Sequence, residues 1–221
     1  MGGLRPPTLT TPMTITEIQQ KILTDDAFVL EEVKKLQYLY GLKDEIRYEL
    51  SRHPDDYSES VAEHVYSMHI VSDYFLKLED SDNQMNHLAI KTMITWHDMD
   101  ELETGDKISW KKTPDDIANE LTAWKSAVVK IPEILQTDVS ILVEQYENKQ
   151  TSEACFVKAV DKLEPLLHLF TPKGKKWIAD SGLTFSLSEK VKVQHIKPFP
   201  FMNRFMVVLH SEMLKQGHFP R

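Results

Sequence analysis

Glycine and cysteine are both scarce in this sequence of 221 residues. It has seven glycines and a single cysteine, Cys155. One cysteine excludes a disulfide bond within the chain, and so little cysteine fits a reducing compartment such as the cytosol. Because turn-rich all-β proteins depend on glycine more than helical proteins do, the shortage favours helix.

Positive charge and long apolar runs are also lacking. Lysine and arginine total 26 against 34 aspartates and glutamates, for a net charge of −8. This argues against a broad nucleic-acid-binding surface, which needs clustered basic side chains, but leaves room for a small anionic substrate. No apolar run approaches the ~20 residues that cross a bilayer, and the N-terminus has no hydrophobic signal core. We expect a cytoplasmic protein that binds neither nucleic acid nor membrane.

The apolar residues recur with a helical period along most of the chain, and no Asn-Gly or Asp-Gly hairpin turn occurs. Thr14 with Glu17 predicts a capping box for a first helix, and Asp25 or Asp26 can begin a second. Residues 1–13 are interpreted as a loose leader. Residues 14–221 are predicted to form one all-α domain, a single-domain helical bundle.

Further along, Ser58 is expected to open a strong helix, and another is expected from about Asn83 to Trp96. Thr113-Pro114 is a good helix start, because proline suits the first turn. Residues 151–170 should form one more helix, which Pro165 should kink or break. The closing segment 202–214 is expected to be helical and to pack back on the body.

His64 lies among the apolar residues of the helix expected after Ser58. A lone histidine on an apolar face is more often a hydrogen-bonded core residue than a metal ligand. His64 by itself therefore favours the structural interpretation.

His97 and Asp98 follow an apolar helix, and Glu101 and Asp106 come soon after. A His beside an Asp at the end of a buried helix offers a neutral nitrogen and a hard oxygen to one cation. Asp98 and Glu101 would share a face if the helix continued, and buried carboxylates that close repel each other unless a cation or proton separates them. The alternative is a solvated acidic loop.

Asp161 lies on or beside the apolar stripe of the 151–170 helix, four residues after Val157. A buried aspartate is costly unless it is paired or metal-bound. Lys158, three residues earlier, could be its partner. Asp161 alone therefore fits an ion pair and a metal site equally well.

Together these segments resemble the HD-domain metal-dependent phosphohydrolases. Within that superfamily they are most similar to the branch that contains the bacterial 5'-deoxynucleotidases. The resemblance covers about residues 30–170, which leaves residues 171–221 as a C-terminal helical extension. It is carried by Ser60-Val61-Ala62-Glu63-His64, by His97-Asp98-x-x-Glu101-x-x-x-Gly105-Asp106, and by Asp161-Lys162-Leu163.

The resemblance implies a task for each matching residue. Glu101 would orient or deprotonate the attacking water, and Asp106 would assist near the scissile phosphate or the sugar. The ligands of one divalent metal ion would be His64, His97, Asp98 and Asp161. This set of two histidines and two carboxylates suits manganese, cobalt, zinc or iron.

Arg47 falls where relatives place a phosphate-contacting arginine, and Arg52 is a second candidate. The segment 53–57 lengthens the stretch before the Ser-Val-Ala-Glu-His motif. This departure from the family pattern bears on both arginines and on the choice of substrate.

No histidine occurs between Asp98 and Asp161. Superfamily relatives that bind two metals add histidines in that interval, so their absence favours one metal and simple hydrolysis. Trp110 could line a substrate pocket, although a tryptophan is more often simply packed.

The sequence thus leads to a hydrolase of (deoxy)nucleoside 5'-monophosphates that releases nucleoside and phosphate. One alternative keeps the site but changes the substrate to a nucleoside triphosphate or guanosine tetraphosphate. Another is a non-catalytic nucleotide-binding regulatory module, which predicts a missing ligand where none is missing. The resemblance also implies a possible homodimer.

Overall fold

The chain is all-α over residues 13–48 and 58–220, which are the residues that the computed structural model describes. Within them no β-strand forms, and one isolated antiparallel bridge joins Ile46 to Ser60. The predicted all-α fold is therefore confirmed. The helices in chain order are α1 (Ile15–Thr24), α2 (Asp26–Leu39), the 3-10 helix η1 (Tyr40–Lys43), α3 (Val61–Glu79), α4 (His87–Trp96), α5 (Glu101–Thr104), the 3-10 helix η2 (Ser109–Lys111), α6 (Pro114–Val128), α7 (Glu133–Asn148), α8 (Ser152–Leu169), α9 (Pro172–Ser181), α10 (Phe185–Ile196) and α11 (Pro200–Lys215).

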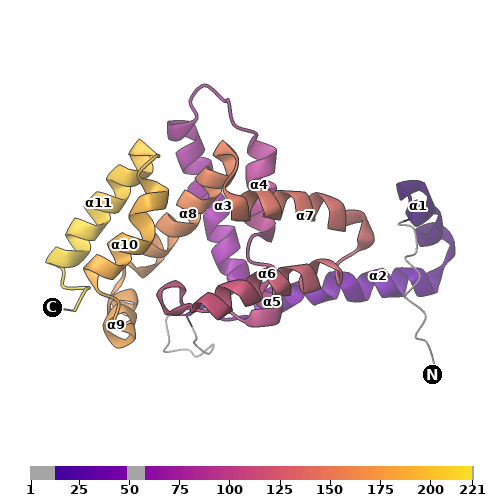
Figure 1. Cartoon of the computed structure of the whole chain (residues 1–221), viewed down its shortest axis with the longest axis horizontal. Coiled ribbons are helices and arrows are strands. Elements are labelled where there is room, and N and C mark those ends of the chain that lie inside the picture. Colours follow the sequence, from indigo (N-terminus) through magenta and orange to yellow (C-terminus); the bar gives the residue numbers. More distant parts are fainter. Residues whose placement is uncertain (1–12, 49–57, 221) are drawn as a thin grey trace.

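Helix α8 is the centre of the bundle, with α3, α4, α7, α9, α10 and α11 packed against it (Figure 1). Ten of its residues are buried, and most of these are apolar, which is typical of a helix at the centre of a bundle. Two of its buried positions are nevertheless acidic, Asp161 and Glu164. Because burying a carboxylate is costly, these two residues direct attention to this part of the core.

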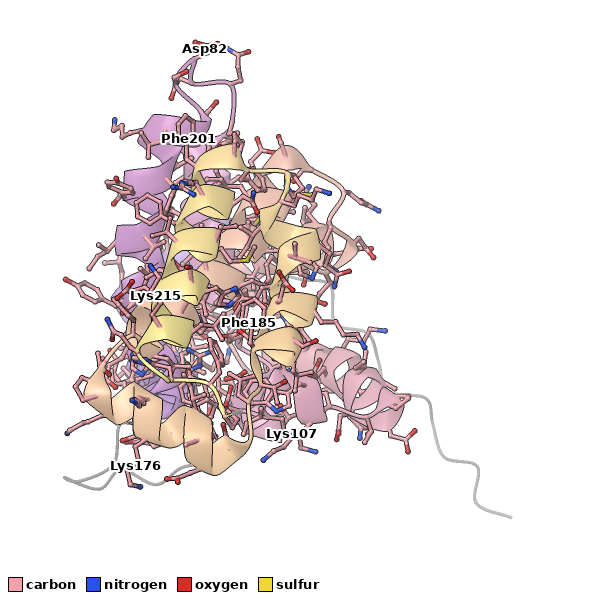
Figure 2. The ribbon with its side chains drawn as sticks, turned by 90° about the vertical axis from the view of Figure 1, so that its left-hand side faces the viewer. Asp82, Lys107, Lys176, Phe185, Phe201 and Lys215 are labelled. Atoms are coloured by element: carbon pink, nitrogen blue, oxygen red, sulfur yellow. The ribbon has the colours of Figure 1, made fainter. Side chains whose placement is uncertain are left out.

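Helix α2 extends away from this body, and α1 lies at its far end (Figure 1). Helix α2 contains no buried residue, and apolar Leu30, Val33 and Leu36 are exposed along it. The C-terminal helices, in contrast, pack against the body. Helices α10 and α11 lie side by side (Figure 2) and contribute buried residues to the main core cluster, such as Ile196 and Met206.

Two helices begin later than expected. Helix α3 begins at Val61 rather than Ser58, because Ser60 accepts from the Glu63 N–H and the Glu63 carboxylate accepts from the Ser60 N–H. Helix α4 begins at His87 rather than Asn83, with Asn86 as its N-cap. The starts expected at Thr14 and Thr113 both carry the cap hydrogen bonds.

Helix α8 continues through Pro165, so of the two expected outcomes there, a kink or a break, the break does not occur. Proline has no N–H, and the carbonyl that loses its helical donor is that of Asp161, four residues earlier. Leu163, Glu164 and Leu166 are buried on both sides of the proline. Tertiary packing of these neighbours holds the helix together despite the missing hydrogen bond.

Candidate metal centre

His64 enters the core from the first turns of α3. The Ser60–Glu63 capping box fixes where this helix starts, and the His64 N–H donates to the carbonyl of Ser60. The segment before the helix is also tied down, because the Arg47 N–H donates to the Glu59 carbonyl and the Val61 N–H to that of Glu45. His64 is fully buried as a result.

His97 and Asp98 leave the C-terminal end of α4. His97 caps the helix through its N–H, which donates to the Met93 carbonyl, and its ring is buried. Asp98 follows at once in a turn and keeps partial contact with solvent. The end of the helix therefore delivers a ring nitrogen and a carboxylate to the same place, as the sequence predicts.

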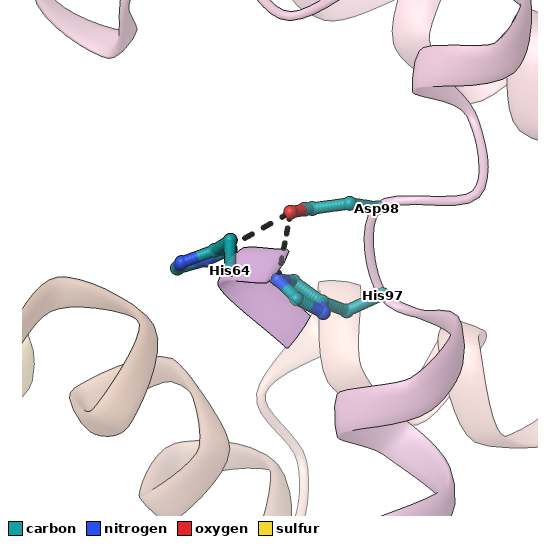
Figure 3. Close-up of side chains that lie close together, drawn as sticks. All are labelled: His64, His97 and Asp98. Carbon is teal, nitrogen blue, oxygen red and sulfur yellow. Dashed lines mark ion pairs between the residues drawn. The ribbon is translucent and has the colours of Figure 1, made fainter. Parts of the chain in front are cut away.

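Figure 3 shows His64, His97 and Asp98 converging on one point. Asp98 Oδ2 lies 3.0 Å from His97 Nε2 and 4.0 Å from His64 Nε2. Both Nε2 atoms are buried without a hydrogen-bond partner. Two unsatisfied ring nitrogens facing one carboxylate form the donor set that a borderline divalent cation prefers.

The other ring nitrogen of each histidine, Nδ1, already has a hydrogen-bond partner. The nitrogen that faces the Asp98 carboxylate is therefore Nε2 in both rings. His64 Nδ1 lies 2.7 Å from Glu164 Oε2, and His97 Nδ1 lies 3.0 Å from the carbonyl oxygen of Ile94. An Nδ1–H that donates to a carboxylate or carbonyl leaves the Nε2 lone pair available to a cation.

Asp161 joins the same cluster from α8. Its Oδ1 lies 3.6 Å from His64 Nε2, while its Oδ2 lies 3.0 Å from both Lys158 Nζ and Lys162 Nζ. Tyr146 also donates to Oδ2. The ion-pair alternative for Asp161 is thus present on Oδ2, while Oδ1 faces the ring of His64.

Glu164 is a residue that the sequence analysis missed. It is buried one turn beyond Asp161 and accepts from His64 Nδ1. The available signal was a glutamate within the apolar stripe of α8, three residues after Asp161. A carboxylate behind a histidine orients the ring and raises its basicity.

Glu101 and Asp106 stand beside the cluster. Glu101 is buried in α5, and its Oε2 has no hydrogen-bond partner. Asp106 accepts from the Tyr48 N–H at 2.5 Å and lies 3.8 Å from Arg47 Nε. Gly105 turns the chain between them at a φ of +70°, a conformation that suits glycine.

Arg47 is buried and mostly engaged with acidic side chains. Its Nη1 lies 2.6 Å from Glu59 Oε1 and 3.7 Å from Glu164 Oε2, whereas its Nε has no hydrogen-bond partner. A second acidic group of Glu59, Glu164 and His168 also has the spacing of a metal site, but the Arg47 guanidinium supplies positive charge there. Arg52 lies outside the described residues.

One pocket joins these groups. Asp98, Glu101, Asp106 and Asp161 line it together with Arg47, and Trp110 is also part of its wall. Trp110 packs edge-on against Trp177, with their ring centroids 5.9 Å apart. The pocket thus has two of the predicted metal ligands, Asp98 and Asp161, and both predicted catalytic carboxylates in its wall.

The carboxylates of this pocket differ in their pKa values. Burial raises the pKa of Glu101 well above its usual range, and the nearby Asp98 and Asp106 add to this rise. Burial alone would raise the pKa of Asp98 too, but His97 and His64 hold it well below its usual range. Without a cation, the pocket therefore favours a protonated Glu101 beside an ionised Asp98.

The pKa of His64 is raised to about 9. Burial and Arg47 act to lower it, but the Asp161 and Glu164 carboxylates outweigh them. A cation would have to displace this proton from the ring, so the donor set fits a metal ion better at neutral or higher pH.

Comparison with known proteins identifies the family. An HD domain family model matches residues 39–202, well over half of the sequence. The chain belongs to the HD domain family, and the resemblance seen in its motifs is confirmed. The match includes α9 and α10, which lie beyond the segment that the motifs cover.

Among curated proteins, the bovine (Bos taurus) 5'-deoxynucleotidase HDDC2 is 32% identical over 111 residues, which are 49% of this chain and 52% of that protein. The human (Homo sapiens) 5'-deoxynucleotidase HDDC2 is 30% identical over 111 residues, with 49% and 52% covered. The chain thus matches about half the length of these relatives.

Two solved structures share the fold. A predicted metal-dependent phosphohydrolase from Magnetospirillum magnetotacticum MS-1 aligns with a TM-score of 0.73 at 22% identity, covering 87% of this chain and 98% of that one. An HD-domain phosphohydrolase from Listeria innocua aligns with a TM-score of 0.55 at 20% identity, covering 81% and 84%. The helical bundle is therefore the one these proteins adopt.

Proposed function

We propose that this chain is a metal-dependent phosphohydrolase that converts (deoxy)nucleoside 5'-monophosphates to nucleoside and phosphate. The observation that carries the proposal is the pair of buried Nε2 atoms of His64 and His97, which have no hydrogen-bond partner and face the Asp98 carboxylate. Such a set is expensive to bury unless a cation occupies it.

One divalent ion, manganese, cobalt, zinc or iron, would be held by His64, His97, Asp98 and Asp161. When bound, it would lower the pKa of a water molecule and draw charge from a phosphoryl oxygen. A single ion is favoured because the neighbouring acidic group of Glu59 and Glu164 already contains the Arg47 guanidinium.

Glu101 would orient the attacking water and take its proton. Its Oε2 is buried without a partner and lies in the same pocket as Asp98, and carboxylates perform this task when placed within hydrogen-bond reach. Arg47, through Nε, which has no hydrogen-bond partner, would contact the phosphate. Asp106, held by the Tyr48 N–H, would assist near the phosphate or the sugar.

The monophosphate is preferred over a triphosphate or guanosine tetraphosphate because the curated relatives are 5'-deoxynucleotidases. All four proposed metal ligands occur in the sequence, and ligand atoms of His64, His97 and Asp98 lie within 4.8 Å of one another. This counts against a non-catalytic regulatory module.

The test is a panel of nucleoside mono-, di- and triphosphates and guanosine tetraphosphate, assayed with each candidate metal while the released product is identified. We expect inorganic phosphate from 5'-monophosphates, faster from deoxynucleotides. Release of pyrophosphate or triphosphate would favour the second substrate class. No turnover of any phosphate ester by metal-loaded protein would refute the proposal.

A further inference from the structure

Basic side chains line the pocket as well as acidic ones. Five lysines line it, Lys107 and Lys112 from the segment before α6, Lys158 and Lys162 from α8, and Lys192 from α10. None of the tasks proposed above uses these lysines.

Two of the five are neutralised by carboxylates of their own. Lys107 forms an ion pair with Asp116, and Lys112 lies 2.5 Å from Glu120. Neither of these carboxylates lines the pocket. The positive charge of each of these two lysines is therefore already balanced by a carboxylate.

The three lysines of α8 and α10 differ in their partners. Lys158 and Lys162 both approach Asp161 Oδ2 at 3.0 Å. Lys192 is buried, with 7% of its surface exposed, and forms no hydrogen bond or ion pair with any residue that the structure describes. Lys192 is thus a buried lysine of the pocket wall without a carboxylate partner of its own.

A buried ammonium group without a carboxylate partner is unfavourable unless an anion enters the pocket. Burial, together with the neighbouring charge of Lys162, accordingly lowers the pKa of Lys192 to about 7.

Resting on the proposed function, we propose that Lys192, together with Lys162, forms an anion subsite that binds the phosphate group of the substrate. Asp161 places this subsite beside the metal centre, because its Oδ1 faces His64 while its Oδ2 faces Lys162. The phosphate would lie between the cation and the two ammonium groups. Lys192 is thereby a substrate-binding residue supplied by α10, outside the segment that carries the family motifs.

The first test is direct binding of inorganic phosphate, measured by titration calorimetry on the full chain, both metal-loaded and chelator-treated. We compare wild type with Lys192→Met, Lys192→Arg and Lys190→Met. Lys190 is the matched control, because it is an exposed lysine of the same helix. We expect Lys192→Met to weaken phosphate binding ~10-fold or more in both states, since a charge-assisted hydrogen bond is lost.

Lys192→Arg should retain most of the affinity, and Lys190→Met should match wild type. Metal content should be the same in all four proteins. With a nucleoside 5'-monophosphate as substrate, Lys192→Met should raise KM by a factor similar to the loss of phosphate affinity.

Phosphate binding that Lys192→Met leaves unchanged would overturn the inference, and so would wild type that binds no phosphate. Loss of binding in Lys192→Met together with no hydrolysis by wild type would support the anion subsite and contradict only the proposed activity. The two proposals are thus separable.

Discussion

At the scale of single residues, the centre depends on which nitrogen of each histidine faces the carboxylate. Glu164 and the carbonyl of Ile94 each occupy an Nδ1 atom, which turns both Nε2 atoms towards Asp98. Glu164 is a positioning residue, because it reaches the cation only through His64. Its contribution should therefore appear in metal affinity.

Glu164→Gln should weaken metal binding 10- to 100-fold, because a neutral amide no longer supports the basicity of His64. The measurement is competition for the metal with a chelator of known affinity. Glu144→Gln is the control, since it makes the same chemical change at an exposed position of α7. Equal metal affinity in both variants would show that Glu164 is only a structural group.

The convergence of His64, His97 and Asp98 could be predicted from the sequence because each of them belongs to a local motif at the start or end of a helix. Glu164 and Lys192 could not, because their importance comes from neighbours distant in sequence. Glu164 meets a histidine 100 residues earlier, and Lys192 faces a pocket formed by other helices. Periodicity marks such residues as buried polar groups but does not say what they contact.

At the scale of the elements, the helix caps determine where the proposed metal ligands lie. The Ser60–Glu63 capping box starts α3 one turn before His64, and the last residue of α4 directly precedes His97. The sequence predicts that these helices exist, but not their first residues. Ser58 and Ser60 are equally good N-caps by composition, and the bridge between Ile46 and Ser60 favours the later one.

Ser60→Ala should destabilise the folded protein by about 1 kcal/mol and also weaken metal binding, because α3 carries His64 from that cap. Thr113→Ala removes the equivalent capping box of α6, which carries no proposed ligand. It should lower stability by a similar amount at unchanged metal affinity. Chemical denaturation and metal competition measure the two effects. The same metal affinity in both variants would contradict the link between cap and site.

At the scale of the whole molecule, the C-terminal helices are part of the helical body rather than an appendage. Trp177 of α9, Ile196 of α10 and Met213 of α11 belong to the main core cluster around α8. No helix in the described ranges has the length and apolar character to cross a membrane. Homodimerisation stays a prediction, and the exposed apolar residues of α2 are compatible with it.

The buried Lys192 should also make stability depend on pH. Its pKa is lowered from 10.5 to about 7 in the folded protein, so between these values the unfolded chain binds more protons. Stability should therefore rise with pH from about 7 to about 10, by on the order of 1 kcal/mol per unit at most. Denaturation of metal-free and phosphate-free protein, wild type against Lys192→Met, measures this slope. Identical slopes would place Lys192 in contact with solvent.

The most direct test of the central claim is to titrate chelator-treated protein with manganese, cobalt, zinc and iron in turn, following bound metal and phosphate release from a deoxynucleoside 5'-monophosphate together. We predict that activity rises with metal and saturates at one ion per chain. Asp98→Ala and His97→Ala should lose metal and activity together, whereas Glu101→Ala should keep the metal and lose the rate. Full activity in the chelator-treated protein, or in Asp98→Ala without bound metal, would contradict the account.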